Sequence, residues 1–431
     1  MREGLILRQR ALGAHPGQAD ALLEGEDFLK VARDGWMRCE WYLSWHHPPE
    51  FPATPSHPTM RPLLLSLLLL RATAVGAQTP SRPTLDEKIG QMLMIGFRGM
   101  VATSDSSIAR DIHRFHLGSV IFFDVDVERQ KADRNIASPV QLTALVDSLQ
   151  SFARVPLLVA IDQEGGRVNR LKTTYGFPAS VSAQYLGALN SPDSTRFYAD
   201  RTARTLKALG INVNFAPVAD VNSNPDNPVI GKLERSYSAD PEVVATHARI
   251  VTAAHRAQGI ITTFKHFPGH GSAWNDSHVG MADVTTTWAA SELIPYRRAI
   301  EAGELDAIMT AHIFNANFDK AHPGTLSKRV LTGMLREELG FTGVIFSDDM
   351  QMKAVASFYG LEQAIELGIN AGIDILTFPN NASVYVPDIA ERAFTTIKML
   401  VSTGRISEAR IDQSYRRIMQ LKRQYGVTTT R

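Results

Sequence analysis

The sequence predicts an α/β protein built as a single (β/α)8 barrel. Three observations support this prediction: short apolar runs recur from about residue 90 onward, amphipathic segments separate them, and glycines follow several of those segments. Strands that alternate regularly with helices are typical of a parallel sheet covered by its own crossover helices. An open doubly wound sheet is the structural alternative. It usually carries a glycine-rich phosphate loop after its first strand, and the run Gly96-Phe97-Arg98-Gly99 does not match that pattern.

The predicted strands are apolar runs rich in Val, Ile, Leu and Phe. They show little polar alternation, as expected for strands that are buried on both faces. The eight runs cover residues 92–97, 119–123, 156–162, 213–220, 261–266, 307–313, 343–348 and 374–378.

The predicted helices carry apolar residues at three- and four-residue spacing. They cover residues 139–152, 199–209, 241–258, 291–302, 328–339 and 361–371. The glycines that follow five of them stand where a C-cap residue with positive φ belongs, and these are Gly210, Gly259, Gly303, Gly340 and Gly372. A last helix over 406–425 is expected to close the barrel, with its arginines and lysines on a solvated face.

Composition excludes some classes of function. The formal net charge is +1 and the chain has no basic stripe, so a nucleic-acid partner is not expected. A membrane-surface partner is not expected either, because there is no polybasic segment.

The N-terminal region differs from the rest of the chain. Met60 and Arg61 precede a leucine-rich run at 63–70, and small residues then lead to Ala77. This order predicts a secretory signal peptide over 60–77, and the run is too short to span a bilayer. Residues 1–59 are then an upstream extension, of the kind that a misassigned start produces. We expect an exported barrel over 78–431, periplasmic or extracellular, without stable membrane insertion. The alternative is a genuine extension with a buried helix at 63–70.

Cysteine chemistry is not expected in the mature protein. The single cysteine, Cys39, lies in the doubtful extension. The predicted mature chain therefore has no disulfide, no thiolate metal site and no cysteine nucleophile.

Polar side chains end several of the predicted strands. Such ends meet at one rim of a barrel, where active sites of this architecture lie. A single polar strand end is equally well explained as a helix cap, but five on one rim favour a site. They are Asp162, Asp220, Lys265 with His266, His312, and Asp348 with Asp349.

The strand-end Asp348 has the position of a carboxylate nucleophile. His278 lies on the loop after the fifth run, and Asp276 stands two residues before it, where a carboxylate can orient the imidazole. A histidine can donate and then accept a proton, so this set meets the requirements of retaining glycoside hydrolysis. Asp349 is expected to point to the opposite side of its strand from Asp348.

The same loop begins Lys265-His266-Phe267-Pro268-Gly269-His270-Gly271, and Gly269 and Gly271 are expected to act as its hinge.

Metal binding is the competing interpretation of this loop. Candidate ligands are His266, His270, Asp276, His278 and Asp283. Against it, Lys265 would place an ammonium beside the cation, and no His-Glu-x-x-His pattern is present. No Gly-x-Ser-x-Gly elbow indicates a serine hydrolase.

The ordered motifs resemble glycoside hydrolase family 3, and more narrowly its β-N-acetylglucosaminidase branch. The resemblance runs from about residue 84 to the C-terminus. Beside the loop from Lys265 through Asp276-Ser277-His278, it rests on four further blocks. These are Ile161 to Arg170, Glu234-Arg235-Ser236-Tyr237, Phe346 to Met352, and Ala364 to Leu376.

The resemblance implies a retaining exo-β-N-acetylglucosaminidase that acts on peptidoglycan fragments or chitin oligosaccharides. It implies that Asp348 is the nucleophile, that His278 is the acid/base and that Asp276 tunes it. The residues implied to bind the terminal N-acetylglucosamine are Asp162, Arg170, Arg235, Lys265 and His266. No metal or other cofactor is expected, and the protein is expected to be monomeric.

Several alternatives stay open at this point. Within the family, these are a β-glucosidase or a phosphorylase. Phosphorolysis stays open because a histidine acid/base does not repel anions as a carboxylate would. Outside it, they are a non-catalytic sugar-binding barrel and a metal-dependent hydrolase.

Overall fold

A computed structural model describes residues 82–428. The predicted upstream extension (1–59) and signal peptide (60–77) lie outside these residues, so export stays a prediction. None of the helices in the described part of the chain is long and apolar enough to cross a bilayer.

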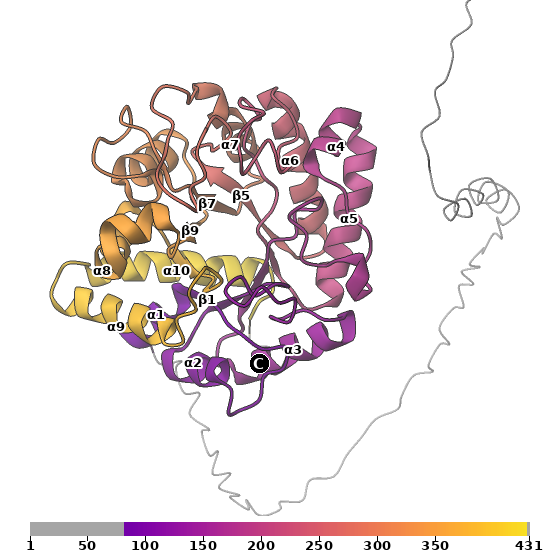
Figure 1. Ribbon diagram of the computed structural model, residues 1–431. Helices are drawn as coiled ribbons and strands as arrows, with labels where there is room; N and C mark the ends of the chain where they lie inside the picture. Colours follow the sequence, from indigo (N-terminus) through magenta and orange to yellow (C-terminus); the bar gives the residue numbers. More distant parts are fainter. Residues whose placement is uncertain (1–81, 429–431) are drawn as a thin grey trace, which may run out of the picture. The chain divides into compact units, whose positions relative to one another are not determined.

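Eight parallel strands form a closed barrel, as the sequence predicts. Around the barrel the order is β1, β10, β9, β7, β5, β4, β3 and β2. Helices surround the strands on the outside (Figure 1). The strands are β1 (Leu93–Gly96), β2 (Ser119–Phe122), β3 (Leu158–Ile161), β4 (Val213–Asn214), β5 (Ile261–Phe267), β7 (Ala307–Thr310), β9 (Val344–Asp349) and β10 (Ile375–Phe378).

Ten α-helices accompany the strands in the described residues, together with η5 (Arg329–Glu338), which has π-helical geometry. Every glycine expected at a helix end has positive φ. The α-helices are α1 (Leu85–Gln91), α2 (Ser107–Phe115), α3 (Pro139–Phe152), α4 (Ala183–Leu189), α5 (Pro192–Ala208), α6 (Pro241–Ala257), α7 (Ile294–Glu301), α8 (Lys353–Ala371), α9 (Ile389–Ser402) and α10 (Glu408–Gln424).

The structure differs from the predicted elements at several places. Helices α1, α2, α4 and α9 were not predicted, and α5 begins seven residues before the predicted 199. The run expected over 213–220 gives only the short strand β4, because the chain leaves the sheet after Asn214. The run over 307–313 ends as a barrel strand at Thr310, and β8 (Ile313–Phe314) instead pairs with β6 (Ala282–Asp283) in a separate small sheet. Helix α8 begins eight residues before the predicted 361, and Gly360 interrupts it at φ 66°.

The barrel is filled by side chains rather than open. Phe215 follows β4, Phe346 lies on β9, and their ring centroids are 5.3 Å apart although these strands are not neighbours in the sheet. The two rings therefore meet across the barrel interior. Edge-to-face packing of this kind is favourable for buried aromatic pairs.

Helix α10 closes the N-terminal end of the barrel, but its cations are not all solvated as expected. The ammonium of Lys422 is buried and donates hydrogen bonds to Gln91 Oε1, the Gly118 carbonyl and the Pro156 carbonyl at 2.7–3.0 Å. These acceptors precede β1, β2 and β3. Burial lowers the pKa of Lys422 to about 7, since no carboxylate compensates for the lost hydration.

Candidate active site

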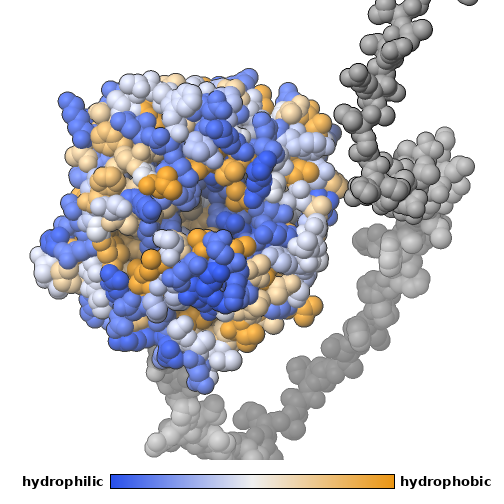
Figure 2. Space-filling model, viewed as in Figure 1, coloured by the Kyte–Doolittle hydropathy of each residue, from blue (hydrophilic) through white to orange (hydrophobic). Residues whose placement is uncertain are grey.

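The C-terminal ends of the strands surround a cavity of about 330 Å³. The face of the molecule in Figure 2 is hollowed near its centre, with hydrophilic and hydrophobic residues interspersed around the hollow. Seven of the eight predicted site residues line the cavity, which brings together side chains from β3, β5, β9 and the loops beyond them. The seven are Asp162, Arg170, Arg235, Lys265, His266, His278 and Asp348.

The Asp348 carboxylate lies at the end of β9. It accepts a hydrogen bond from the N–H of Asp349 at 2.7 Å. Burial by itself would raise the pKa of Asp348, but this bond and the charges of three nearby histidines outweigh burial and bring the pKa down to about 2. The histidines are His266, His278 and His312. The carboxylate is therefore ionised at neutral pH, as a nucleophile must be.

Asp349 lines the same cavity as Asp348, which contradicts the expectation that it points away. Its carboxylate accepts the N–H of Gln351 at 2.8 Å. Burial, together with the charge of Asp348, raises the pKa of Asp349 to about 7. The strict alternation of a strand fails here because the pairing register between β9 and β10 shifts at this end.

Asp276 does not line the cavity but contacts His278. Its Oδ1 atom lies 2.7 Å from His278 Nδ1 and accepts the backbone N–H of His278 at the same distance. The bond orients the ring and leaves Nε2 for exchange of a proton with a ligand in the cavity. More than half of the His278 side chain is exposed, unlike Asp348.

Opposite charges alternate along one wall of the cavity. Lys265 Nζ lies 2.7 Å from Asp162 Oδ1 and 2.6 Å from Glu164 Oε1. Arg235 donates two hydrogen bonds to Glu164, each 2.8 Å long. The two cations outweigh the effect of burial and hold the pKa of Glu164 well below its usual range. Arg170 is held more loosely, with Nη2 4.0 Å from Asp162 Oδ2.

Two further carboxylates contribute to the site. Glu164 follows a predicted strand but was not singled out from the sequence, and Asp220 was recognised only as a polar strand end without a specific role. The carboxylate of Asp220 is completely buried. It accepts the backbone N–H groups of His266 and His270, at 3.1 and 2.7 Å, and its Oδ2 lies 2.7 Å from His266 Nδ1. This fixes the orientation of His266, whose Nε2 faces Arg235 at 3.4 Å.

The expected hinge at Gly269 and Gly271 is instead a tightly packed turn. A Cβ atom on Gly269 would lie 2.6 Å from Glu292 Oε2, and one on Gly271 would lie 1.7 Å from the Val221 carbonyl. Glu292 is buried beneath this turn and accepts the N–H of Gly271 at 3.1 Å. Glycine is required here by close contact rather than by motion.

The histidines of the loop do not assemble as metal ligands. Within residues 82–428, no group of three His, Cys, Asp or Glu side chains has an arrangement that could hold a metal ion. His266 contacts Asp220 instead, and His270 contacts Ser277.

Comparison with known proteins identifies the family. The model of the glycosyl hydrolase family 3 N terminal domain matches residues 84–421. The chain belongs to glycosyl hydrolase family 3. The predicted family membership is thereby confirmed.

Individual relatives of this family 3 chain carry consistent names. It is 33% identical over 393 residues to beta-hexosaminidase A of Pseudoalteromonas piscicida, covering 81% of this chain and 62% of that protein. A glycoside hydrolase family 3 beta-N-acetylglucosaminidase from Paenibacillus sp. str. FPU-7 is 37% identical with a TM-score of 0.73, covering 80% and 63%. A beta-N-acetylhexosaminidase from Beutenbergia cavernae is 30% identical with a TM-score of 0.70, covering 79% and 99%. The chain thus spans under two thirds of the first two relatives. The predicted enzyme class, a glycoside hydrolase, agrees with all three names.

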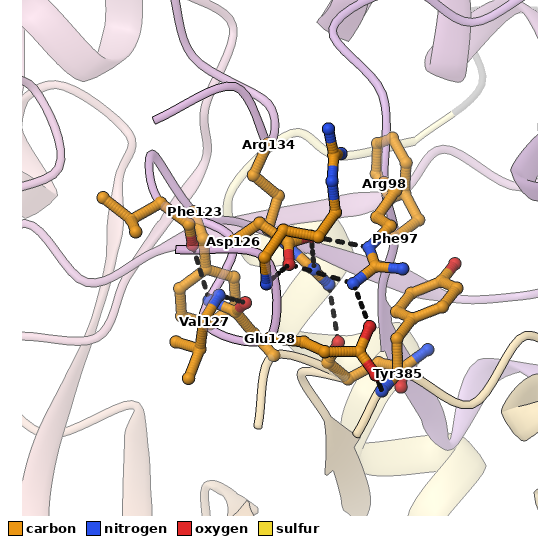
Figure 3. A network of polar contacts seen from close by, with 12 residues as sticks. Phe97, Arg98, Phe123, Asp126, Val127, Glu128, Arg134 and Tyr385 are labelled. Atoms are coloured by element: carbon orange, nitrogen blue, oxygen red, sulfur yellow. Dashed lines mark hydrogen bonds and ion pairs between the residues drawn. The ribbon is translucent and has the colours of Figure 1, made fainter. Parts of the chain in front are cut away.

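The rim of this family 3 barrel is completed by a polar network between the loops after β1, β2 and β10 (Figure 3). Asp126 accepts hydrogen bonds from Arg98 at 2.6 and 2.9 Å and from Arg134 at 2.9 Å. Arg98 also contacts Glu128 and lies over the ring of Tyr385 at 4.1 Å. The network supports a wall of the cavity, to which Val125, Val127, Pro379 and Asn381 contribute.

Loss of the Asp126 charge should destabilise the fold. Asp126→Asn would leave Arg134, which is buried, without its carboxylate, and breaking a buried pair in this way costs about 3–5 kcal/mol. The free energy of unfolding in urea measures the loss. Glu128→Gln is the control and should change stability far less, because its pair with Arg98 is solvent-exposed and weakened by water. Equal effects of both substitutions would contradict this account.

Glu292 should make stability depend on pH. Burial raises its pKa from 4.5 to about 8. Between these two pH values the folded chain therefore holds a proton that the unfolded chain has released. This contribution to stability is complete below the unfolded pKa and is lost as the pH rises through about 8. Glu292→Gln should therefore gain stability relative to wild type as the pH rises from 5 to about 9. Urea unfolding at several pH values tests this, and a pH-independent difference would refute it.

Proposed function

We propose that this chain is a retaining exo-β-N-acetylglucosaminidase. The observation that carries the proposal is the pairing of two groups at one cavity. Asp348 is a carboxylate held ionised by its surroundings, and His278 is an imidazole oriented by Asp276. Nucleophilic attack and reversible proton transfer are the two functions that retaining hydrolysis requires.

In the first step, an Asp348 oxygen attacks the anomeric carbon of the terminal sugar. The bond from that carbon to the leaving oxygen breaks, and the leaving oxygen takes the proton from His278 Nε2. The products are a glycosyl ester on Asp348 and a free alcohol. In the second step, His278 Nε2 removes a proton from water, whose oxygen attacks the same carbon and releases Asp348. Two displacements at one carbon retain its configuration.

The charged wall is suited to holding the hydroxyl groups of a terminal sugar. Asp162 and Glu164 accept hydrogen bonds and Lys265 and Arg235 donate them, and each is already positioned by a charged neighbour. Such preorganised, charge-assisted bonds fix a substrate with little further loss of entropy. We propose these residues, with Arg170 and His266, as the sugar-binding set. The names of the relatives support N-acetylglucosamine as that sugar, and peptidoglycan fragments or chitin oligosaccharides are the proposed natural sources.

Replacing the two central groups should separate their functions. Asp348→Asn should abolish release of the phenol from an aryl N-acetylglucosaminide, whereas His278→Ala should lower kcat/KM by about 100- to 10,000-fold. An activated 5-fluoro-N-acetylglucosaminyl donor should trap the ester on Asp348, which mass spectrometry of the peptides can locate.

The neighbouring carboxylate of Asp349 provides the comparison for this experiment. Asp349→Asn should still accept the label, because burial raises the pKa of Asp349 to about 7 and its carboxyl group is less fully ionised than that of Asp348. Labelling that survives in Asp348→Asn and disappears in Asp349→Asn would overturn the assignment of the nucleophile. The reaction is run with and without phosphate, and sugar phosphate as the main product would indicate phosphorolysis.

A further inference from the structure

The loop segment 274–280 carries the proposed acid/base but has little contact with the barrel. Its residues are exposed or partly exposed, with the single exception of Ser277, which lies between Asp276 and His278. Ser277 is only 2% exposed, whereas the side chain of His278 is 60% exposed. The middle residue of this tripeptide therefore points into the protein while its neighbours face the solvent or the cavity.

One hydrogen bond connects this segment to the rest of the protein. Ser277 Oγ lies 3.1 Å from His270 Nε2. The other hydrogen bonds made within 274–280 join residues of the segment to one another, for example from Val279 and Gly280 to the Asp276 carbonyl. Among the described residues, His270 is thus the only hydrogen-bonding anchor of the segment.

His270 is itself fixed from several sides. Its backbone N–H donates to Asp220 Oδ1 at 2.7 Å, and its carbonyl accepts from Asn227 Nδ2 at 2.7 Å. The ring is buried, and its centroid lies 6.0 Å from that of His266. Burial lowers the pKa of His270 to about 4, so the ring is neutral at neutral pH. Asp220 holds His266 as well, and the anchor therefore joins the loop to the frame that positions the sugar-binding wall.

We infer that the hydrogen bond between His270 and Ser277 sets the position of the His278 ring at the leaving oxygen. His270 and Ser277 are then positioning residues for general acid catalysis. A displacement of about 1 Å in a catalytic group can cost about 100-fold in rate, so one fixed contact in an otherwise exposed segment is significant. The inference rests on the proposed function, since it assumes that His278 transfers the proton.

A series of aryl N-acetylglucosaminides with different leaving groups tests this positioning role of Ser277 on the whole protein. The value of kcat/KM reports the step in which the leaving group departs. Good leaving groups such as dinitrophenol need little help from an acid, and poor ones need it fully. Ser277→Ala should lower kcat/KM by about 10- to 100-fold for poor leaving groups and far less for dinitrophenol. The dependence of rate on leaving-group pKa should become steeper.

Two matched comparisons separate positioning from folding. Ser277→Thr and Ser277→Val have nearly the same shape, and only the threonine keeps a hydroxyl group. In the threonine variant, kcat/KM should depend on the leaving-group pKa as weakly as in wild type. In the valine variant, this dependence should stay steep. Asn275→Ala, an exposed change in the same segment, should leave the dependence as in wild type. Thermal unfolding of each variant shows whether it is folded.

The combination with His278→Ala gives the decisive result. If Ser277 acts through His278, then Ser277→Ala should have no further effect once the imidazole is gone. Equal losses for all leaving groups, or an additional loss in the double variant, would overturn the inference while the proposed function stands. If the wild-type protein releases no phenol from any donor, the proposed function fails, and the inference fails with it.

Discussion

The buried carboxylate of Asp220 is the interaction on which the proposed site depends. It follows β4, the shortest strand of the barrel, and binds His266 in β5 and His270 in the loop after β5. A buried charge is costly unless it is fully hydrogen-bonded, and here two backbone N–H groups and an imidazole meet that need. The same bonds fix His266 towards the sugar-binding wall and His270 towards the exposed loop. One carboxylate therefore holds both the sugar-binding wall and the base of the exposed loop in place.

The proposed chemistry is distributed between a rigid part and a lightly held part. Asp348 and the charged wall lie on or next to barrel strands, where packing determines their positions. Asp276 and His278 lie on an exposed segment that reaches the barrel through Ser277. This division suits a two-step reaction, because the acid/base must serve first a departing alcohol and then a water molecule. The nucleophile meets the same carbon in both steps and gains from being fixed.

The barrel and the strand-end residues of the site were predictable because they depend on local patterns, whereas Arg170 and Arg235 were implied only by the family resemblance. Continuous apolar runs indicate buried strands, and polar residues directly after them must meet at one rim. Relations between distant residues were not predictable. Nothing in the sequence near Glu164 shows that Lys265 and Arg235 neutralise its charge. The three residues belong to different βα units of the barrel and are far apart in the sequence.

The misjudged details have physical causes as well. Asp349 reaches the cavity because the pairing register shifts at the end of β9, which an alternation rule cannot foresee. Gly269 and Gly271 suggested motion, but they make room for Glu292 and for the Val221 carbonyl. A glycine records only that a side chain is excluded, and the reason lies in residues that are remote in sequence.

The burial of Lys422 has a practical consequence. Its bonds to the residues that precede β1, β2 and β3 hold the end of α10 against the barrel floor, opposite the cavity. A fusion partner or a surface linker joined after this helix would leave the molecule from the side remote from the cavity mouth. Attachment after α10 should therefore leave the entrance of the cavity open.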